Sequence, residues 1–445
     1  MHHLFAVAGN PVLHSRSPEI FNAAFASLGI DATYTRIAAS SAEGILEIAK
    51  GMPIEGLNIT SPFKEEIASL VETDEDAKEI GAVNTLVSNG SGGFLGRNTD
   101  WMGAVGALEN SNAKIKNSNA VVLGAGGAAS AAAYGLLKKG AKVTILNRTA
   151  KKAEKIAKRL GCHGAGLGMA EKALESASIV VSCIPGAERV LEPRLLQKGM
   201  AVLDANYMHA SALIEDAKKA GCTAIDGREW LLYQAIPAFE LFLGMKAPVE
   251  VMRNALYSAD ACKNITFWQK DTGKRASGAS GNISLIGFMG SGKTSVAKEI
   301  GAIADMEVLE TDREIEKLAG KSISQIFQTN GESEFRKLEK KEIAKLGIIS
   351  NKVISCGGGT VLDINNQKAI SNNSTVFWLF ADASTILNRL GEAGDRPLLM
   401  AADSNGRKMK IEKLLESRMP DYARAANAIV DTRGKTPKQI AERIC

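Results

Sequence analysis

Two glycine-rich turns constrain the fold of this chain more than any other feature, because each lies between an apolar run and a helical pattern. The first is GAGGAA at residues 124–129, after AVVL, and the second is GFMGSGKT at residues 287–294, after ISLI. A buried strand, a glycine turn and a helix together are typical of nucleotide-binding α/β folds. Since the two turns follow different patterns, and we find no internal repeat, we expect two unrelated α/β regions in one chain.

The stretch DTGKRASGASG, residues 271–281, separates these regions. It is small, polar and rich in glycine and serine, with no apolar period on which a regular element could form, so we expect a linker. On both sides of it, apolar runs alternate with helical patterns, as in parallel sheets with crossover helices. The length of 445 residues suffices for about three domains of ordinary size.

Composition excludes several classes of protein. The chain has 54 basic and 49 acidic residues, a net charge of +5, which is too small to favour nucleic acid as the main partner. Its six cysteines form no C-x-x-C pair, so neither a disulfide framework nor a structural zinc site is indicated. The first residues show no secretory pattern, and the uncharged run at 117–137 contains four glycines, which favours strand, turn and helix over a membrane span. We therefore expect a cytoplasmic protein with small-molecule substrates, no nucleic-acid partner and no membrane partner; the oligomeric state, a homodimer included, is left open.

The first glycine turn has the pattern G-x-G-G-x-A, formed by Gly124, Ala125, Gly126, Gly127, Ala128 and Ala129. In such a turn the first glycine makes the bend, the second lets the backbone approach a pyrophosphate, and a small third residue allows the helix to pack closely. The alternative is a tight turn without a ligand. Because the next strand, KVTILN, follows at the right distance, the pattern predicts a dinucleotide site.

The end of that next strand indicates which dinucleotide binds. An NAD site has an acidic residue about 20 positions after the glycines. This strand instead ends in Asn147, Arg148 and Thr149, with Lys152 one turn later. A guanidinium beside a hydroxyl suits a 2′-phosphate, so the sequence favours NADPH/NADP. The alternative is a solvated basic start of a helix.

Polar clusters interrupt the first 110 residues, which otherwise have the apolar pattern of a packed domain. GNPVLHSRSP contains Ser15 and Ser17, although a serine before a proline is also a good helix N-cap. NITSPFKEE places Lys64 in the first turn of an expected helix, where the helix dipole disfavours an ammonium and so suits an acid catalyst. GAVNTL and RNTDW supply Asn84 and Asp100, and the alternative for Asp100 is a cap on the helix that follows.

In this order, the motifs GNPVLHSRSP, NITSPFKE, GAVNTL, NTD, GAGGAA, NRT and DGREWLLYQA resemble those of shikimate dehydrogenases, over residues 1 to about 265. The resemblance implies NADPH-dependent reduction of 3-dehydroshikimate to shikimate by a bilobed α/β region at 1–270. Its substrate lobe would comprise 1–110 and 229–270, and its Rossmann NADP lobe 111–228. By motif, Lys64 and Asp100 would be the catalytic pair. The residues implied to hold the substrate are Ser15, Ser17, Thr60, Asn84, Asp100, Tyr207 and Gln234, and Gly227 is implied in the cofactor site.

Two stretches depart from this family's usual pattern. Around the nicotinamide ribose the family usually has N-A-T-S-x-G, whereas this chain has SCIPGAERV at 182–190. The stretch MHASAL after Tyr207 lacks the usual Gly/Pro and Thr-Pro pattern. We expect these departures to affect nicotinamide positioning more than the phosphate site. Because Lys64 and Asp100 are intact, an active enzyme is favoured over a binding-only relative.

The second glycine turn completes the pattern G-x-x-x-x-G-K-T. Its expected nucleotide contacts are Gly287, Gly290, Ser291, Gly292, Lys293, Thr294 and Ser295. Backbone N–H groups of such a loop cradle phosphates, the lysine reaches the outer phosphates, and the threonine hydroxyl can ligate magnesium. The pattern predicts binding of a nucleoside triphosphate but leaves the acceptor open, because ATPases, GTPases and kinases share it.

Residues around this loop indicate the acceptor. LETDREIE ends a strand with Glu310 and Asp312, GESEFRKLE contains Arg336, and CGGGT contains three successive glycines. GEAGDRPLLM and ESRMPDY add Arg396 and Arg418. Each arginine alone is more often part of a surface ion pair. The ordered set resembles shikimate kinases, over residues 282 to about 443.

This resemblance implies a three-layer α/β phosphate-loop kinase at 282–445 that uses ATP and Mg²⁺. Asp312 would take the proton of the attacking hydroxyl, while Lys293 and a lid residue, Arg396, would neutralise charge during transfer. Arg389 would pack on adenine. Glu310, where the family commonly has Asp, would bind the metal together with Thr294. The residues implied to bind shikimate are Asp312, Arg336, Gly357, Gly358, Gly359 and Arg418.

The two resemblances support each other, since the first reaction would form the hydroxyl that the second would phosphorylate. We therefore expect a bifunctional enzyme that makes shikimate 3-phosphate from 3-dehydroshikimate, toward aromatic amino acids. Two alternatives stay open. One is a quinate-type dehydrogenase fused to a kinase of another small alcohol, and the other is a chain in which one region only binds its ligand. A flexible linker of this length would keep the two sites near each other without aligning them.

Overall fold

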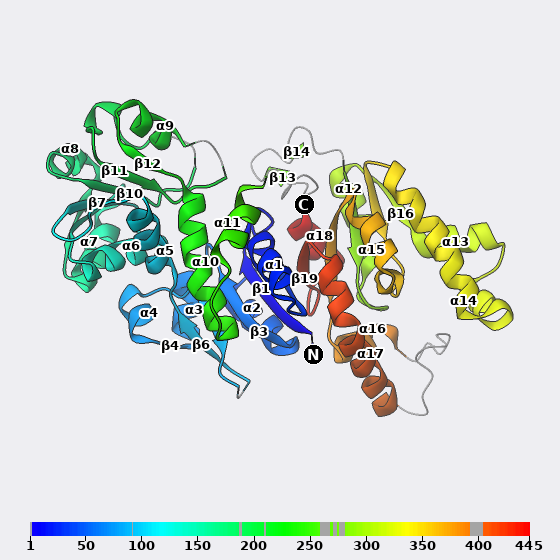
Figure 1. Cartoon of the computed structure of the whole chain (residues 1–445). Helices are drawn as coiled ribbons and strands as arrows, with labels where there is room; N and C mark the ends of the chain where they lie inside the picture. Colours follow the sequence, from blue (N-terminus) through cyan, green and yellow to red (C-terminus); the bar gives the residue numbers. More distant parts are fainter. Residues whose placement is uncertain are drawn as a thin grey trace.

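The computed structural model describes residues 2–90, 92–186, 189–208, 211–258, 281–391 and 404–445, and the backbone at 268–269 and 274–275. These residues form three α/β units that lie in a row (Figure 1). We call them the first lobe (2–110 and 227–258), the second lobe (111–226) and the C-terminal region (281–391 and 404–445). The mixed α/β class expected from the alternating apolar and helical patterns is confirmed.

The first lobe contains a six-stranded arrangement in the order β2-β1-β3-β5-β6-β4, in which β5 runs antiparallel to its neighbours β3 and β6. Strand β1 is buried along nearly its whole length because helices pack on the sheet from both sides. The strands are β1 His3–Gly9, β2 Ala32–Ala38, β3 Ile54–Ile59, β4 Glu72–Thr73, β5 Thr85–Ser88 and β6 Phe94–Arg97. The helices are α1 Ser17–Leu28, α2 Ala42–Gly51, α3 Lys64–Leu70, α4 Glu75–Ile80, α5 Asp100–Asn110, α10 Gly227–Leu243 and α11 Val249–Tyr257.

The second lobe is a parallel sheet in the order β12-β11-β10-β7-β8-β9. This is the doubly wound order of dinucleotide folds, in which ligands bind where the chain changes direction across the sheet, here between β7 and β10. The strands are β7 Asn119–Leu123, β8 Lys142–Asn147, β9 His163–Gly166, β10 Ile179–Ser182, β11 Ala201–Asp204 and β12 Thr223–Ile225. The helices are α6 Gly127–Lys138, α7 Ala150–Leu160, α8 Ala170–Leu174 and α9 Ala212–Lys219, with short 3₁₀ turns η1 Leu167–Met169 and η2 Pro193–Leu195.

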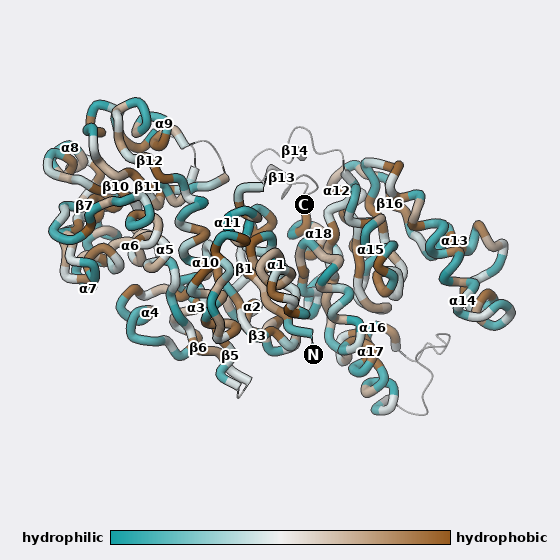
Figure 2. Tube along the Cα trace, in the orientation of Figure 1, coloured by the Kyte–Doolittle hydropathy of each residue, from teal (hydrophilic) through white to brown (hydrophobic). Residues whose placement is uncertain are grey.

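The C-terminal region is also built on parallel strands, in the order β16-β17-β15-β18-β19. Its outer helices α13 and α14 alternate between hydrophilic and hydrophobic segments (Figure 2), as expected for helices with one buried face. The strands are β15 Asn282–Ile286, β16 Glu307–Glu310, β17 Lys352–Ser355, β18 Ser374–Phe380 and β19 Ala428–Asp431. The helices are α12 Lys293–Ala304, α13 Thr311–Ala319, α14 Ile323–Ala344, α15 Ile364–Ser371, α16 Ala383–Leu390, α17 Ser404–Ala425 and α18 Pro437–Ile444, with η3 Lys345–Ile348 and η4 Thr360–Leu362.

The stretch 271–281 lies largely outside the described residues. Within it, β14 (Lys274–Arg275) pairs antiparallel with β13 (Trp268–Gln269). The expectation that this stretch forms no regular element is therefore wrong for two residues, because antiparallel backbone pairing does not need an apolar period.

The C-terminal region and the first lobe share one sheet. Strand β19 pairs parallel with β2, through Ile429 opposite Ile37 and Val430 opposite Ala38, so that eleven strands form a single sheet. One apolar cluster spans the junction and includes Ile37, Trp378 and Ile429. Among the described residues, no helix combines the length and the apolar character needed to cross a bilayer.

Candidate active sites

Lys64 and Asp100 form an ion pair at the end of the first lobe that faces the second lobe. The Lys64 Nζ lies 2.5 Å from the Asp100 Oδ2, and the two side chains are only 18% and 8% exposed. Lys64 is the first residue of α3, so its expected position in the first turn of a helix is confirmed, and Asp100 is the first residue of α5. The alternative that Asp100 caps its helix is wrong, because Thr99 occupies the N-cap position and Asp100 bonds to Lys64 and Asn84 instead.

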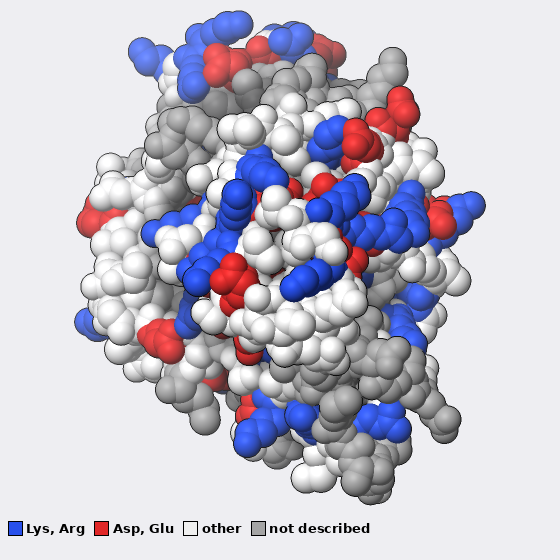
Figure 3. All heavy atoms as spheres, turned by 90° about the vertical axis from the view of Figure 1, so that its right-hand side faces the viewer, with Lys and Arg blue, Asp and Glu red and all other residues white. Residues whose placement is uncertain are grey.

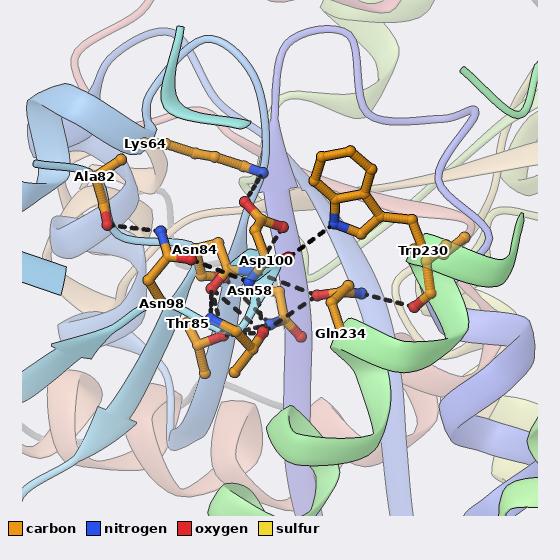
Figure 4. Close-up of polar contacts among 11 residues, drawn as sticks. Asn58, Lys64, Ala82, Asn84, Thr85, Asn98, Asp100, Trp230 and Gln234 are labelled. Atoms are coloured by element: carbon orange, nitrogen blue, oxygen red, sulfur yellow. Dashed lines mark hydrogen bonds and ion pairs between the residues drawn. The ribbon is translucent and has the colours of Figure 1, made fainter. Parts of the chain in front are cut away.

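A buried network of amides and hydroxyls holds Asp100 from behind (Figure 4). Asn84 Nδ2 donates to Asp100 Oδ1 over 2.9 Å and to Gln234 Oε1 over 3.3 Å, so α5, α10 and the loop before β5 meet at one amide. Trp230 Nε1 donates to the Asp100 carbonyl. Because buried polar groups need partners, this network fixes the carboxylate in one orientation and leaves its second oxygen to the lysine.

Ser15, Ser17 and Thr60 follow β1 and β3 at the carboxyl edge of the same sheet. Ser15 Oγ donates to Ser17 Oγ over 3.3 Å, and both serines are buried. The N-cap alternative for Ser17 is wrong, because α1 begins at Ser17 itself and Arg16 is its N-cap. Thr60 lies directly after β3, and Tyr207 lies in the loop after β11.

The glycine turn of the second lobe lies against Lys64 and Glu65. A Cβ placed on Gly127 would lie 3.5 Å from the Cβ of Lys64, and one on Gly126 would lie 4.0 Å from Glu65 Oε1. Gly124 has a φ of +115° and approaches the Cys183 carbonyl, which explains glycine at this position. Ala125, Ala128 and Ala129 continue the turn into α6, and Gly227 at the start of α10 packs so tightly that a Cβ would lie 2.5 Å from the Ala205 carbonyl oxygen.

The predicted 2′-phosphate residues lie beside this turn. The Gly124 N–H donates to the Leu146 carbonyl, so the end of β8 adjoins the glycines. Arg148, Thr149 and Lys152 are exposed, and Asn147 Nδ2 donates to the Thr149 carbonyl over 3.1 Å. Two cations and a hydroxyl therefore face solvent next to the turn, an exposure that a 2′-phosphate site and a solvated basic helix start have in common.

The atypical stretch 182–190 begins at the end of β10, near Asp100 and Lys64. Residues 187 and 188 lie outside the described residues. Burial raises the pKa of the Cys183 thiol, and the nearby Asp204 and Asp100 carboxylates raise it further. Arg189 forms two hydrogen bonds with the Asp216 carboxylate, over 2.8 and 3.1 Å, and Asn206 Nδ2 donates to the Gly186 carbonyl. The stretch is thus anchored to the loop after β11 and to helix α9.

The phosphate loop of the C-terminal region wraps Lys293. The Lys293 Nζ donates to the Gly287 and Phe288 carbonyls over 2.8 and 2.9 Å, and α12 begins at this lysine. Gly287, Gly290 and Gly292 all have positive φ values, +140°, +80° and +94°. Ser291 lies within the loop, and Thr294 and Ser295 occupy the first turn of α12, whose N–H groups point into the loop.

Thr294 and Glu310 lie close enough to share a hydrated cation. Thr294 Oγ1 is 3.5 Å from Glu310 Oε2 and 3.4 Å from Ser355 Oγ. The described residues hold no cluster of three or more His, Cys, Asp and Glu side chains, so a metal here would need oxygen atoms from phosphate and water. That ligand set fits magnesium, which keeps several waters and is held by one or two carboxylates plus phosphates.

The predicted acceptor residues converge beside the phosphate loop. A Cβ on Gly357 would lie 2.6 Å from Asp312 Oδ1, one on Gly359 would lie 2.6 Å from Arg336 Nη2, and one on Gly358 would lie 3.2 Å from the Met289 N. The three glycines thus let a carboxylate, a guanidinium and the phosphate loop approach one backbone segment.

Arginines from α14, α16 and α17 complete this region. Arg418, 8% exposed, lies 5.5 Å from the centre of the Phe288 ring. Burial alone would lower the pKa of Arg336, but the carboxylates of Glu339 and Glu332 raise this pKa above its ordinary value. Arg389 donates to the Ser291 carbonyl and to Thr432, while burial lowers its pKa. Arg396 lies outside the described residues.

The comparisons with known proteins decide the family. The chain is 39% identical over 264 residues to the shikimate dehydrogenase (NADP(+)) of Natronomonas pharaonis, a match that spans 58% of this chain and 99% of that protein. The chain belongs to the shikimate dehydrogenase family. Family models for the shikimate dehydrogenase substrate binding domain, for shikimate / quinate 5-dehydrogenase and for the shikimate 5'-dehydrogenase C-terminal domain match residues 7–86, 107–210 and 227–257. A shikimate kinase model matches residues 289–445, so the chain carries dehydrogenase and kinase domains together.

Solved structures agree with the dehydrogenase fold. A shikimate 5-dehydrogenase from Thermus thermophilus in complex with NADP(H) and shikimate has a TM-score of 0.53 and 30% identity, covering 57% of this chain and 98% of that chain. A quinate dehydrogenase from Corynebacterium glutamicum in complex with NAD has a TM-score of 0.52 and 30% identity, covering 57% and 98%. The first and second lobes therefore have the bilobed shikimate dehydrogenase architecture.

The shikimate dehydrogenase motifs did not reveal every residue of these sites. Asn58, Tyr34 and Thr85 form the inner part of the Asp100 network: Tyr34 OH donates to Asn58 Oδ1 over 2.6 Å and Asn58 Nδ2 donates to Thr85 Oγ1 over 3.0 Å. Burial raises the pKa of Tyr34 well above its ordinary value. A polar residue between two apolar residues of a strand, as Asn58 is between Leu57 and Ile59 in β3, is the signal that could have found them.

In the kinase domain, sequence reasoning also missed Glu339 and Tyr422. Glu339, 2% exposed, bonds to Arg336 over 2.7 Å and to Thr360 Oγ1 over 2.9 Å. Tyr422 OH donates to the Gly358 carbonyl over 2.5 Å, and burial raises the pKa of Tyr422 to about 12. Both side chains hold predicted acceptor residues in place. Glu339 lies one helical turn after Arg336, which is the spacing that could have found it.

Proposed function

We propose that this chain catalyses two consecutive reactions: NADPH-dependent reduction of 3-dehydroshikimate to shikimate, and ATP-dependent phosphorylation of shikimate to shikimate 3-phosphate. The observation that carries the proposal is the Lys64–Asp100 pair, held by a buried network against a dinucleotide turn. The same chain holds a second, phosphate-binding turn, which lies against a pocket of glycines, Asp312 and Arg336.

In the first reaction, bound NADPH supplies a hydride to the ketone carbon. Lys64 Nζ, which donates to Asp100 Oδ2, would protonate the developing alkoxide oxygen, and Asp100 would orient the lysine and accept from the substrate hydroxyl. Ser15, Ser17, Thr60, Asn84, Tyr207 and Gln234 would bind the carboxylate and remaining hydroxyls. Arg148, Thr149 and Lys152 would bind the 2′-phosphate of the cofactor. Asn147, Gly227 and residues 124–129 would contact the rest of the cofactor.

In the second reaction, ATP supplies the phosphoryl group and magnesium screens its charge. Asp312 would accept the proton of the attacking hydroxyl, Arg336, Arg418 and Gly357–Gly359 would hold shikimate, and Lys293 would neutralise charge on the phosphoryl oxygens. Residues 287–295 would cradle the phosphates, Thr294 and Glu310 would hold the metal, Arg389 would contact adenine and Arg396 would close over the phosphates.

The surface of the kinase end agrees with small-molecule substrates. Figure 3 shows Lys and Arg interspersed with Asp and Glu over the part of this face drawn in colour. A nucleic-acid site would favour a continuous basic stripe. We further propose a cytoplasmic location, with residues 271–281 linking the two enzymes; a homodimer remains a prediction that sedimentation would test.

The test is to incubate the purified chain with 3-dehydroshikimate, NADPH, ATP and magnesium and to identify the products by mass spectrometry. We expect shikimate 3-phosphate. Shikimate alone would contradict the kinase half, and direct addition of shikimate would then separate an inactive kinase from a failed transfer. No turnover with 3-dehydroshikimate, but turnover with quinate and NAD in the reverse direction, would favour the quinate-type alternative over the proposal.

A further inference from the structure

Arg36 lies where the first lobe meets the kinase domain, and it is nearly inaccessible, with 3% exposure. It projects from β2, the strand that pairs with β19. Its Nε and Nη2 both donate to the Ser15 carbonyl, over 3.1 and 2.5 Å, and Nη2 also donates to Glu19 Oε1 over 2.7 Å. Its Nη1 donates to the Asn427 carbonyl of the kinase domain over 3.4 Å. One guanidinium therefore contacts the dehydrogenase pocket and the kinase at once.

On the dehydrogenase side, Arg36 fixes the segment that carries Ser15 and Ser17. The Ser15 carbonyl accepts hydrogen bonds from two N–H groups of Arg36, and the Ser15 hydroxyl in turn donates to the Ser17 hydroxyl. Glu19, in the first turn of α1, balances the buried charge. Removing the guanidinium would leave a buried carbonyl and a half-buried carboxylate without their donor, so the serine segment would have to move to find others.

On the kinase side, the contact is made by a residue that cannot shift freely. Asn427 lies between α17 and β19, its side-chain oxygen accepts from the Val376 N–H over 2.7 Å, and its own N–H donates to the Val376 carbonyl over 2.8 Å. Helix α17, just before it, carries Arg418 and Tyr422. The carbonyl that Arg36 reaches is thus fixed to the central part of the kinase sheet.

From these contacts we propose that Arg36 is a positioning residue for the dehydrogenase pocket, and that it sets the Ser15–Ser17 segment with the docked kinase domain as its support. The proposal rests on the proposed function, because it assigns Ser15 and Ser17 to binding 3-dehydroshikimate. Arg36 touches neither substrate nor cofactor in this role. Its planar fork serves three acceptors in different directions, which a lysine ammonium on a flexible stem does not reproduce.

The test compares Arg36→Met and Arg36→Lys with Arg424→Met as the matched control. Arg424 is also an arginine at the junction, paired with Asp31, but it is 39% exposed and contacts no proposed site residue. For Arg36→Met we expect the KM for 3-dehydroshikimate to rise at least tenfold, with kcat and the KM for NADPH within twofold of the parent chain. Arg36→Lys should reverse less than half of the rise in the KM for 3-dehydroshikimate. Arg424→Met should leave both KM values and kcat unchanged.

The same variants are examined by hydrogen exchange with mass spectrometry of the full chain. In Arg36→Met, amides of β2 and β19 should exchange at least tenfold faster, while those of β7 and β8 in the second lobe stay unchanged. An unchanged KM for 3-dehydroshikimate would overturn the positioning role, and a raised KM with unchanged exchange at β19 would overturn the kinase's part in it. Should Arg36→Met not fold, Glu19→Gln, which weakens the same anchor with little change of shape, should raise the same KM.

If the parent chain does not reduce 3-dehydroshikimate at all, the proposed function fails. The exchange measurement still decides whether Arg36 joins the two domains.

Discussion

At the scale of single residues, Lys64 is the side chain on which we expect reduction to depend most directly. Lys64→Met removes the proton donor but keeps much of the stem, so we expect dehydrogenase kcat to fall by about 10²–10⁴-fold. Phosphorylation of added shikimate should be unchanged, since Lys64 lies in the first lobe, away from the phosphate loop. Lys139→Met, at an exposed pair with Glu109, is the control and should leave both rates as they are. Loss of both activities in Lys64→Met would contradict separate catalytic sites.

Arg148 tests the choice of cofactor. Arg148→Ala removes a guanidinium from the exposed end of β8, and a hydrogen bond to a charged group contributes about 1.5–3 kcal/mol. We expect the KM for NADPH to rise by roughly 10–100-fold while the KM for NADH changes little, as measured by steady-state absorbance. Arg194→Ala, in an exposed pair of the same lobe, is the control. An equal effect on NADPH and NADH would exclude a 2′-phosphate contact.

Glu310 tests the metal site. Glu310→Gln keeps the shape of the side chain and removes the charge opposite Thr294, so the half-saturating magnesium concentration of the kinase should rise on the order of tenfold. Glu307→Gln, on the same strand but 74% exposed, should have no effect. A magnesium titration at saturating ATP and shikimate measures both, and identical curves for the two variants would rule out Glu310 as a ligand.

At the scale of elements, the phosphate loop depends on a backbone conformation that residues other than glycine rarely adopt. Gly287 has a φ of +140°, and a Cβ there would lie 2.6 Å from the Leu379 carbonyl oxygen. Gly287→Ala should therefore lower kinase kcat/KM by at least about 10–100-fold, from strain of the order of 1–3 kcal/mol in the loop. Gly347→Ala, where a Cβ meets nothing within 4 Å, is the control. Normal phosphorylation by Gly287→Ala would show that the loop tolerates the change.

The sequence predicted those elements that short local motifs mark. Both glycine turns and the strands before them follow from glycine spacing and apolar runs, and the helix position of Lys64 follows from Ser61 and Pro62 just before it. Asn58, Tyr34 and Glu339 were missed because their partners are distant in the chain or unmarked by any motif. The pairing of β19 with β2 was also missed, because the sequence of an apolar strand does not indicate which sheet edge the strand pairs with.

At the scale of the whole molecule, the shared sheet couples the two enzymes more firmly than a flexible linker would. A non-hydrolysable ATP analogue at 100 times its Kd stabilises the kinase by about 2.7 kcal/mol, or about 100-fold in the opening equilibrium. Because Ile37 and Ala38 pair with β19, hydrogen exchange of β2 should also slow, by up to that factor. Amides of β9, at the far edge of the second lobe, are the control. If exchange slows only in the kinase domain, then β2 opens independently of the kinase domain and the two enzymes are not coupled through the sheet.

The parallel course of the shared sheet also places the two candidate sites along one of its edges. Strands β1, β2 and β3 run in the same direction as β15 to β19, so their carboxyl ends lie along one edge. Ser15 and Lys64 follow β1 and β3 at that edge, as the phosphate loop follows β15. Four strand spacings separate β1 from β15, about 20 Å along the sheet, over which the twist turns by roughly a quarter circle. The two candidate sites thus lie along the same edge of one sheet, so that a product released from the first would enter solvent at the edge along which the kinase site also lies.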